Sequence, residues 1–392
     1  MIRPLVGALA AALCLAEAAA GAERPFQPTP DAVDHVVTMA ATNTIVGAGV
    51  SRSVPRGVRT IVHHGDWTRV VTAADGERPA TVDHFGRSAS VSVSLRTSEA
   101  SAGGFRTLVV RRGPKIAGAG GLLRDPVRTQ ERRAVLGETC EVWAFYSPVV
   151  RGYAEHSCVT EDGIELWRGT AIDGVEVSSA EATRVERRPV DPDEVQPPSG
   201  LLDLASWMRP PAPAGLTSLV RASPRRDHEV VLTSDRAKFM GFGITQVRRR
   251  HRDWTHVETV YGDTHRVLDV RNDATGFRLN LVGWPPDGSE TLAISDGPLP
   301  GDEATMRTGG KPTANFAMVS GEVCSVIDTA PGMKGGGAAQ CRTWDGIVLK
   351  DMRWGPHFGE TFRAVLVQRS GVGMAAILPP NILSRERWGL PR

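Results

Sequence analysis

The sequence predicts a mostly β protein built from two tandem domains. The first observation is a repeat, since a cysteine pair followed by Asp-Gly-Ile occurs twice and Cys324 follows Cys140 by 184 positions. The second is short runs in which apolar and polar residues alternate, a pattern typical of strands with one buried face. The third is the Asp-Gly turn between such runs, which indicates antiparallel hairpins.

The repeat extends on both sides of the cysteines. Residues 64–68 recur as residues 251–255 at an offset of 187, and Trp207 recurs as Trp388 at an offset of 181. A nearly constant offset over so long a stretch predicts two copies of one module. It also provides a filter: a residue that the module needs should occur in both copies, whereas a residue that serves one site need not.

The predicted organisation has four parts. Residues 1–22 form a signal peptide, with a positive start, a short apolar stretch and small residues before the cleavage site. Residues 40–209 form the first β repeat domain, 210–224 a linker rich in proline, and 225–392 the second β repeat domain. Cys14 is removed with the signal peptide. We expect the mature protein in the periplasm, without a transmembrane segment.

Four cysteines remain in the mature chain, two in each copy at matching positions. In an exported chain, this pattern predicts the disulfides Cys140–Cys158 and Cys324–Cys341. Each bridge would stabilise its domain by roughly 3 kcal/mol. Two alternatives remain. A zinc site would need ligand spacings that these cysteines lack, and pairing between the copies would leave the duplication without a simple origin.

Helices are expected at few places. A short helix is expected at 31–39, and helical segments are expected after the Pro-Pro turn of each copy, at 201–208 and 382–388. The glycine-rich stretches 116–121 and 332–339 are expected to be hairpin tips. A phosphate-binding loop would need a preceding strand, a following helix and a Lys-Ser/Thr pair, which these stretches lack.

Histidines and acids cluster in the strand region of each copy, which raises the question of a metal site. Only His64 and His251 occupy matching positions, and the adjacent His63 and His64 would point to opposite faces of a strand. We therefore expect solvated polar residues there, with no metal and no cofactor. The nucleophile and zinc-protease motifs Gly-x-Ser-x-Gly and His-Glu-x-x-His are absent, so no enzyme is expected. A metal-dependent hydrolase is the least favoured hypothesis.

Several motifs together carry a family resemblance. They are the Asp-Trp-Thr-x-Val motif at 66–70 and 253–257 and the Gly-x-x-Cys entry at 137–140 and 321–324, followed by the second cysteine and Asp-Gly-Ile. With its signal peptide, the chain resembles tandem-duplicated periplasmic domains of unknown function related to the outer-membrane lipoprotein carrier (LolA/LppX-like) fold. The resemblance implies a strongly curved antiparallel sheet, a partial barrel, in each domain. This chain is doubled, disulfide-bonded and poor in helices, so no functional residue is carried over.

An incomplete barrel leaves an apolar concavity that a ligand or the protein's own side chains must fill. The leading hypothesis is therefore non-catalytic binding of a hydrophobic or amphipathic ligand, such as a lipid. The second is an envelope structural or protein-interaction module, in which the core is self-filled and an envelope protein pairs with a sheet edge. A net charge of +2 disfavours nucleic acid as a partner. The candidate ligand-binding residues, all apolar, matched between the copies and alternatively core residues, are Trp67, Trp254, Ile164, Leu166, Ile347 and Leu349.

Overall fold

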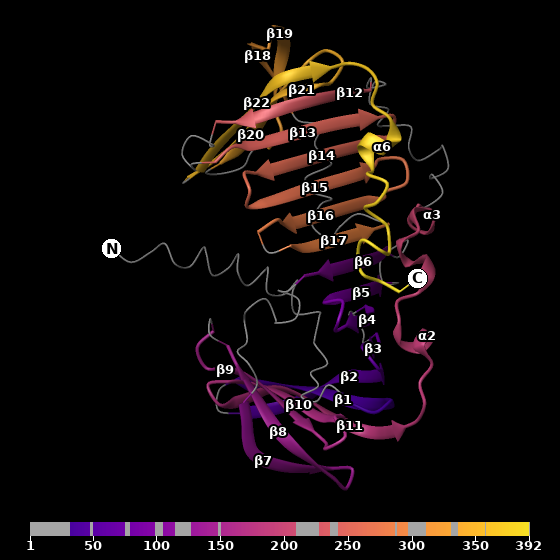
Figure 1. Ribbon diagram of the computed structural model, residues 1–392. Coiled ribbons are helices and arrows are strands. Elements are labelled where there is room, and N and C mark those ends of the chain that lie inside the picture. The colour runs from indigo at the N-terminus through magenta and orange to yellow at the C-terminus, as the bar shows by residue number, and fades with distance from the viewer. Residues whose placement is uncertain are drawn as a thin grey trace, which may run out of the picture. The chain divides into compact units, whose positions relative to one another are not determined.

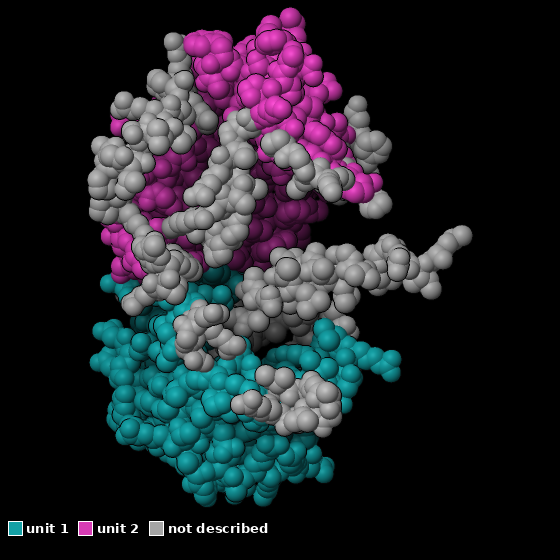
Figure 2. All heavy atoms as spheres, turned by 180° about the vertical axis from the view of Figure 1, so that it is seen from behind, with its two compact units in different colours: residues 1–104, 108–199, 388–392 teal, residues 105–107, 200–387 magenta. Residues whose placement is uncertain are grey.

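The chain divides into two compact units, both mostly β with few short helices, which confirms the predicted fold class (Figures 1 and 2). Unit 1 comprises 1–104, 108–199 and 388–392, and unit 2 comprises 105–107 and 200–387. The predicted signal peptide and the linker 210–224 lie outside the described residues. The computed structural model describes residues 32–47, 50–74, 79–98, 105–113, 127–147, 150–208, 227–235, 242–286, 288–296, 311–330, 336–356 and 358–391.

Unit 1 is a curved antiparallel sheet whose neighbouring strands are mostly successive along the chain (Figure 1). The exception joins the first strand to the closing strand, where Val37 of β1 lies opposite Val185 of β11. The strands are β1 (His35–Gly47), β2 (Val50–His64), β3 (Trp67–Thr72), β4 (Ala80–Gly86), β5 (Val91–Ser98), β6 (Phe105–Arg112), β7 (Val127–Val135), β8 (Glu138–Tyr146), β9 (Tyr153–Val159), β10 (Glu165–Ile172) and β11 (Val175–Arg187). The first three residues of β6 are grouped with unit 2.

Unit 2 has the same strand order, and its first strand again pairs with its closing strand, with Val231 of β12 opposite Leu366 of β22. In both units the register between the first and the closing strand shifts, between Thr38 and Met39 of β1 and between Val231 and Leu232 of β12. The strands are β12 (His228–Ser234), β13 (Ile244–His251), β14 (Trp254–Tyr261), β15 (His265–Asn272), β16 (Arg278–Trp284), β17 (Ser289–Ser295), β18 (Lys311–Val319), β19 (Glu322–Asp328), β20 (Gly337–Arg342), β21 (Val348–Gly355) and β22 (Phe358–Gln368).

Two stretches differ from the sequence prediction. The helix predicted at 31–39 is wrong from His35 onward, because β1 begins there and pairs with β11 on one side and β2 on the other. The β-branched run Val36, Val37 and Thr38 suits a strand, and two ladders satisfy its backbone. The predicted hairpin tip 332–339 is shorter than expected, since β20 begins at Gly337. The stretch 116–121 lies outside the described residues.

Short helices follow the closing strands β11 and β22. After β11 come α2 (Pro192–Val195), η2 (Ser199–Leu202) and α3 (Leu204–Trp207), the last two within or overlapping the predicted segment 201–208. Asp191 caps α2 in a capping box with Glu194, a strong helix-start signal.

The helix after β22 lies elsewhere than predicted. α6 (Met374–Ile377) follows β22, whereas 382–388 forms turns, so the helix predicted there is wrong. In the segment 382–388, the N–H of Ile382 donates to the carbonyl of Pro379, and the N–H of Ser384 donates to that of Asn381, as in turns. None of the helices in the described residues is long and apolar enough to cross a membrane.

Each unit has a hydrophobic core built around its disulfide. In unit 1, Ile164 and Leu166 pack with Cys140 and Cys158 and are fully buried. In unit 2, Ile347 and Leu349 pack in the same way with Cys324 and Cys341. Since burying a large aliphatic side chain contributes about 1.5–3 kcal/mol, these clusters are a main source of stability in each unit.

Candidate functional site

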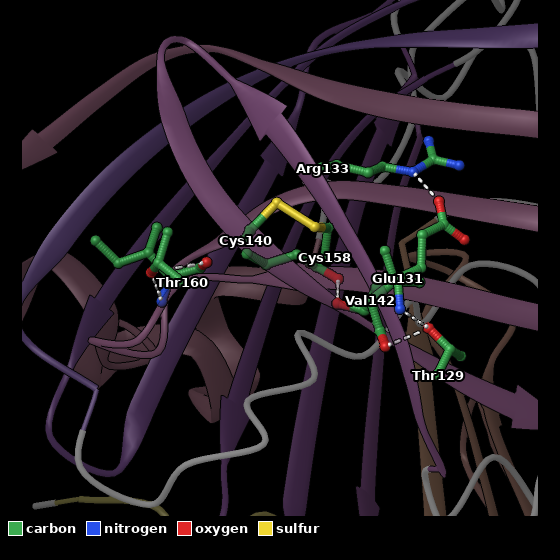
Figure 3. The surroundings of a disulfide bond; sticks show 10 residues. Thr129, Glu131, Arg133, Cys140, Val142, Cys158 and Thr160 are labelled. Carbon is green, nitrogen blue, oxygen red and sulfur yellow. Dashed lines mark hydrogen bonds and ion pairs between the residues drawn. A yellow bond between two sulfur atoms is a disulfide. The ribbon is translucent and has the colours of Figure 1, made fainter.

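Both predicted disulfides are present. Cys140 of β8 is bonded to Cys158 of β9, with the Cα atoms 5.3 Å apart (Figure 3). Cys324 of β19 is bonded to Cys341 of β20, with the Cα atoms 5.2 Å apart. Each bond joins two neighbouring strands, and all four residues are buried. The bonds therefore hold neighbouring strands together, and their sulfur atoms are buried away from solvent.

An arginine at the end of β11 connects three parts of unit 1. Arg187 donates from Nη1 to Glu138 Oε1 at 3.0 Å and from Nε to Asp162 Oδ2 at 2.6 Å. Glu138 begins β8, and Asp162 lies in the turn between β9 and β10. The same turn is held by Thr160, whose Oγ1 donates to Asp162 Oδ1 at 2.5 Å and accepts from the Ile164 N–H at 2.9 Å.

Unit 2 contains the same arrangement. Arg369 donates from Nη1 to Glu322 Oε1 at 2.7 Å and from Nε to Asp345 Oδ2 at 2.9 Å. Thr343 again donates to the aspartate and accepts from the Ile347 N–H at 3.0 Å. We call each set of one arginine and two carboxylates an arginine clamp. The clamp ties the closing strand to the cysteine-bearing hairpin in both units.

The electrostatics of the clamp favour full ionisation. The hydrogen bond from Arg187 lowers the pKa of Glu138. Burial by itself would raise the pKa of Asp162, but the hydrogen bonds from Arg187 and Thr160 together outweigh it and lower this pKa. The two carboxylates in turn raise the pKa of Arg187. A carboxyl group that stays ionised and paired is suited to holding structure and not to taking up a proton in catalysis.

None of the clamp residues was predicted as a site residue, although each clamp arginine and glutamate recurs in the second half of the sequence. Arg187 and Arg369 are 182 positions apart, and Glu138 and Glu322 are 184 apart, as Cys140 and Cys324 are. Applied to charged residues, the repeat filter finds both arginine clamps.

An open depression of about 480 Å³ lies beside the clamp of unit 1. The residues that line it are Glu138, Thr139, Thr160, Glu161, Asp162 and Arg187. At the positions of Thr139 and Glu161, unit 2 has Val323 and Trp344, at offsets of 184 and 183. The shared clamp is thus bordered by polar side chains in unit 1 and by apolar ones in unit 2.

Four of the predicted ligand-binding residues are core residues. Ile164, Leu166, Ile347 and Leu349 are each 0 % exposed and belong to the two disulfide cores. Side chains packed in this way contact the protein itself, so these four positions leave no exposed surface to a ligand.

The two candidate tryptophans differ from each other. Trp67 is buried, and its ring lies over Gly86, the residue opposite it on β4, so that a Cβ at Gly86 would be 2.7 Å from the ring. Trp254 is half-buried and contacts Phe277 edge-on, with the ring centroids 5.6 Å apart. Both rings fill space within their own unit, as aromatic anchors of a sheet do.

The matching histidines each bind one aspartate. His64 Nδ1 is 2.9 Å from Asp34 Oδ2, and His251 Nδ1 is 2.7 Å from Asp227 Oδ2. Each aspartate directly precedes the first strand of its unit, so these pairs fix the start of β1 and β12. Among the described residues, no group of three histidines, cysteines or acids is placed to hold a metal ion.

Two other histidines bind the helices that follow the closing strands. His84 Nδ1 donates to the carbonyl of Val195 at 2.7 Å, and His256 Nδ1 donates to the carbonyl of Ile377 at 2.7 Å. Burial lowers the pKa of His84 to about 4, so this ring is neutral near pH 7. The two histidines come from different strands, β4 and β14, yet each holds the last residue of a short helix against its sheet.

Unit 1 also contains a buried histidine pair. The rings of His35 and His63 are stacked with their centroids 5.2 Å apart, and His63 Nδ1 is 3.0 Å from Thr68 Oγ1. Burial lowers the pKa of both, that of His63 to about 4. In unit 2 an arginine, Arg250, occupies the position of His63 and donates to Thr255. The pair is therefore specific to unit 1.

The comparisons with known proteins leave the family open. No protein-family model matches the chain, and no curated protein matches it. Similar solved structures are MucB in complex with MucA(peri), the MucA/MucB complex of Pseudomonas aeruginosa, and MucB alone. They are 11, 10 and 12 % identical to the chain, and each match covers 70 % of it and 91, 92 and 90 % of the other protein. The TM-score is 0.27 in each case.

Proposed function

We propose that the protein is a non-catalytic protein-binding module of the bacterial cell envelope, exported to the periplasm with both disulfides formed. One observation carries this proposal. Ile164, Leu166, Ile347 and Leu349, which would line a ligand cavity in a partial barrel, are 0 % exposed and packed on the disulfides. When the inner face of a curved sheet is filled by its own side chains, a partner can bind only at the outer face or at an edge.

Exposed apolar side chains of unit 2 support the same function. Phe316 is 71 % exposed, Met318 74 %, Val323 60 % and Trp344 83 %. Large apolar residues at such exposure are typical of protein-interaction surfaces, and aromatic residues contribute most of the binding energy there. We call these four residues the apolar patch.

The polar residues that two copies share support a non-catalytic role. The arginine clamps, the threonine turns and the His64 and His251 pairs each connect elements of one unit. The proposal treats the units as copies of one module, because the disulfide, clamp and turn recur at matching positions. Residues of a single binding site are then to be sought among the differences between the copies, and the apolar patch is one.

Native mass spectrometry of the mature protein, purified from a periplasm without detergent, tests the proposal first. We expect masses of one or more polypeptide copies, with no bound small molecule. A discrete lipid or amphiphile at one or two per chain would contradict the proposal and restore the ligand-binding hypothesis.

Photo-crosslinking in the envelope tests it second. A photoreactive residue at Trp344 should give discrete adducts with one or a few proteins, whereas the same residue at the exposed Val175 of unit 1 should give none. Equal labelling from both positions would show non-specific contact and count against the proposal.

A further inference from the structure

Two hairpins, β7–β8 in unit 1 and β18–β19 in unit 2, are built on one plan. The two turn residues have positive φ angles in both, 53° and 80° at Leu136 and Gly137 and 52° and 79° at Ser320 and Gly321. Two consecutive positive φ values define the type I′ turn, which matches the twist of a tight hairpin. The backbone of the two hairpins is thus closely similar at the turn.

The first strand of each hairpin also carries the same bulge. In β7 the Thr129 hydroxyl donates to the carbonyl of Val142 at 2.8 Å (Figure 3), and in β18 the Thr313 hydroxyl donates to that of Val326 at 2.8 Å. The register shifts at this point in both strands. Because the backbones agree, differences between the hairpins lie in their side chains.

Those side chains differ on the outer face. Met318 lies directly opposite Val323, and Phe316 lies two residues before Met318, so all three share a face that points away from the core residue Cys324. They form the hairpin part of the apolar patch. The residues at the same positions of unit 1, all at an offset of 184, are Arg132, Ala134 and Thr139.

The two hairpins also differ in the number of charged residues on their first strand. β7 carries four charged residues, whereas β18 carries only Lys311, at its first position. Among the register pairs of the described residues, β18 is bonded to β19 alone. Charged side chains on an edge strand prevent pairing with another chain, and an apolar, uncharged edge permits it. The charge that protects the edge of unit 1 is therefore missing from β18 after Lys311, and Pro312 and the bulge before Phe316 blunt only the start of this strand. The charged residues of β7 are Arg128, Glu131, Arg132 and Arg133.

The backbone of β18 presents hydrogen-bonding groups to this edge. In a hairpin with a two-residue turn, the pair beside the turn exchanges both hydrogen bonds, and every second residue then does so. Val319 and Ala317 accordingly bond to β19. Phe316 and Met318 direct their N–H and carbonyl groups to the opposite side, where a further strand would pair.

We propose that this further strand is β18 of a second copy of the chain, in an antiparallel pairing about a two-fold axis. Centred on Ala317, the pairing places Phe316 opposite Met318 of the other copy, an apolar pair of the kind that stabilises sheets. The two Lys311 residues lie about twelve residues apart along the strands, on the order of 40 Å, so they do not repel each other.

The corresponding pairing of β7 is disfavoured by charge. Its centre would be Arg133, which pairs with Glu131 at 3.0 Å and lies over the Trp167 ring. The two copies of a strand with three arginines and one glutamate would then face each other across the axis. Like charges directly opposite in a sheet are destabilising. The same backbone plan therefore allows self-pairing in unit 2 and prevents it in unit 1, which is the basis for choosing a second copy as the occupant.

Sedimentation velocity of the mature, oxidised protein over about 1–100 μM tests the dimer, since interfaces of modest area commonly have affinities in the micromolar range. We expect a concentration-dependent dimer. The variant F316R/M318A/V323T, which installs the unit 1 residues, should weaken dimerisation about 100-fold, because it removes the buried anchors of the interface. The matched control Leu136→Ser, which installs a unit 2 residue in the unit 1 hairpin, should dimerise like the wild type.

Hydrogen exchange gives a second readout that needs no variant. The amides of Phe316 and Met318 should exchange more slowly at high protein concentration, whereas those of β7 should not change. A wild-type monomer throughout, or a triple variant that dimerises as well as the wild type, would overturn the inference. The inference rests on the proposed function only in taking the apolar patch as an interaction surface. A monomer that crosslinks to another envelope protein through Trp344 would refute the dimer alone.

Discussion

Arg187 and Arg369 show what a single residue contributes to both units. Arg187 ends β11, and Arg369 directly follows β22. Each arginine binds two carboxylates from different segments, and the distances agree between the units within a few tenths of an ångström. Residues that differ between the units at matched positions are not required by the shared fold. His63 faces Thr68 where Arg250 faces Thr255, and the fold accepts both. Matched residues therefore hold the fold, and unmatched ones can acquire a separate role.

Replacing Arg187 by Ala should lower the free energy of unfolding by about 1 kcal/mol, measured by urea denaturation at pH 7. The partners are partly exposed, so solvent screening reduces the effect below that of a buried pair. Arg369→Ala should have a similar effect. The control is Arg184→Ala, because the Arg184 side chain is 72 % exposed and its ion pair, with Glu186 at 2.7 Å, stays within β11. Equal effects of R184A and R187A would contradict the structural role of the clamp.

The buried histidines should make unit 1 sensitive to acid. The folded pKa of His63 and of His84 is about 4, below the ordinary 6.5. Below pH 6.5 the unfolded chain takes up protons that the folded chain does not, so stability falls as the pH falls from about 6.5 towards 4. We expect urea denaturation to give an unfolding free energy about 3 kcal/mol lower at pH 5.0 than at pH 7.5.

His63→Gln should remove part of this pH dependence. Between pH 7.5 and pH 5.0, the loss of unfolding free energy in H63Q should be about 1.5 kcal/mol smaller than the loss in the wild type. His35 and Arg87 disfavour the charged form of His63, whereas Asp34 favours it. His265→Gln, at a half-buried surface histidine of unit 2, is the control and should keep the wild-type slope. The same slope in H63Q would show that His63 does not cause the acid sensitivity.

Most elements could be predicted from local pattern, and the failures occur where distant parts of the chain decide. The strand around Val91 and Val93 follows from alternation, and the disulfides follow from the repeat. The strand β1 could not be predicted in this way, because its two neighbours, β2 and β11, are brought together only by the tertiary fold. The same holds for the arginine clamp, whose members come from three segments. The strand face of Ile164 predicted core or cavity lining without distinguishing them, and the structure packs this side chain in the core of unit 1.

The cysteine-bearing hairpins are the elements where covalent bonds add most to stability. C140A/C158A should lower the unfolding free energy by roughly 3 kcal/mol in the chain-entropy picture, measured by urea denaturation. C324A/C341A should have nearly the same effect, since the bridges span 18 and 17 positions. Dithiothreitol should destabilise the wild type and leave a variant without all four cysteines unchanged. A much smaller loss in one unit would show that its packing alone holds that hairpin.

At the scale of the whole molecule, the described residues combine two oxidised cores with the apolar edge strand β18. Buried disulfides persist in an oxidising compartment, which accords with export. An exposed apolar edge strand is an aggregation hazard unless it has a partner. Both features fit a protein that folds after export and then pairs through β18. The disulfide of unit 2 joins β19 to β20, and β19 is the strand that pairs with β18. Oxidation in the periplasm should therefore stabilise the strand that supports the pairing edge.

Cleavage of the signal peptide should leave a mature chain without a free thiol. The sequence has five cysteines, four of which are paired in the structure, and the fifth, Cys14, lies outside the described residues within the predicted signal peptide. Amino-terminal sequencing of periplasmic protein should therefore begin at Glu23, and thiol titration in denaturant should find none. Protein retained in a reducing cytoplasm should instead titrate all five. One thiol per chain in the periplasmic protein would show that Cys14 is retained, and two or more would contradict complete disulfide formation.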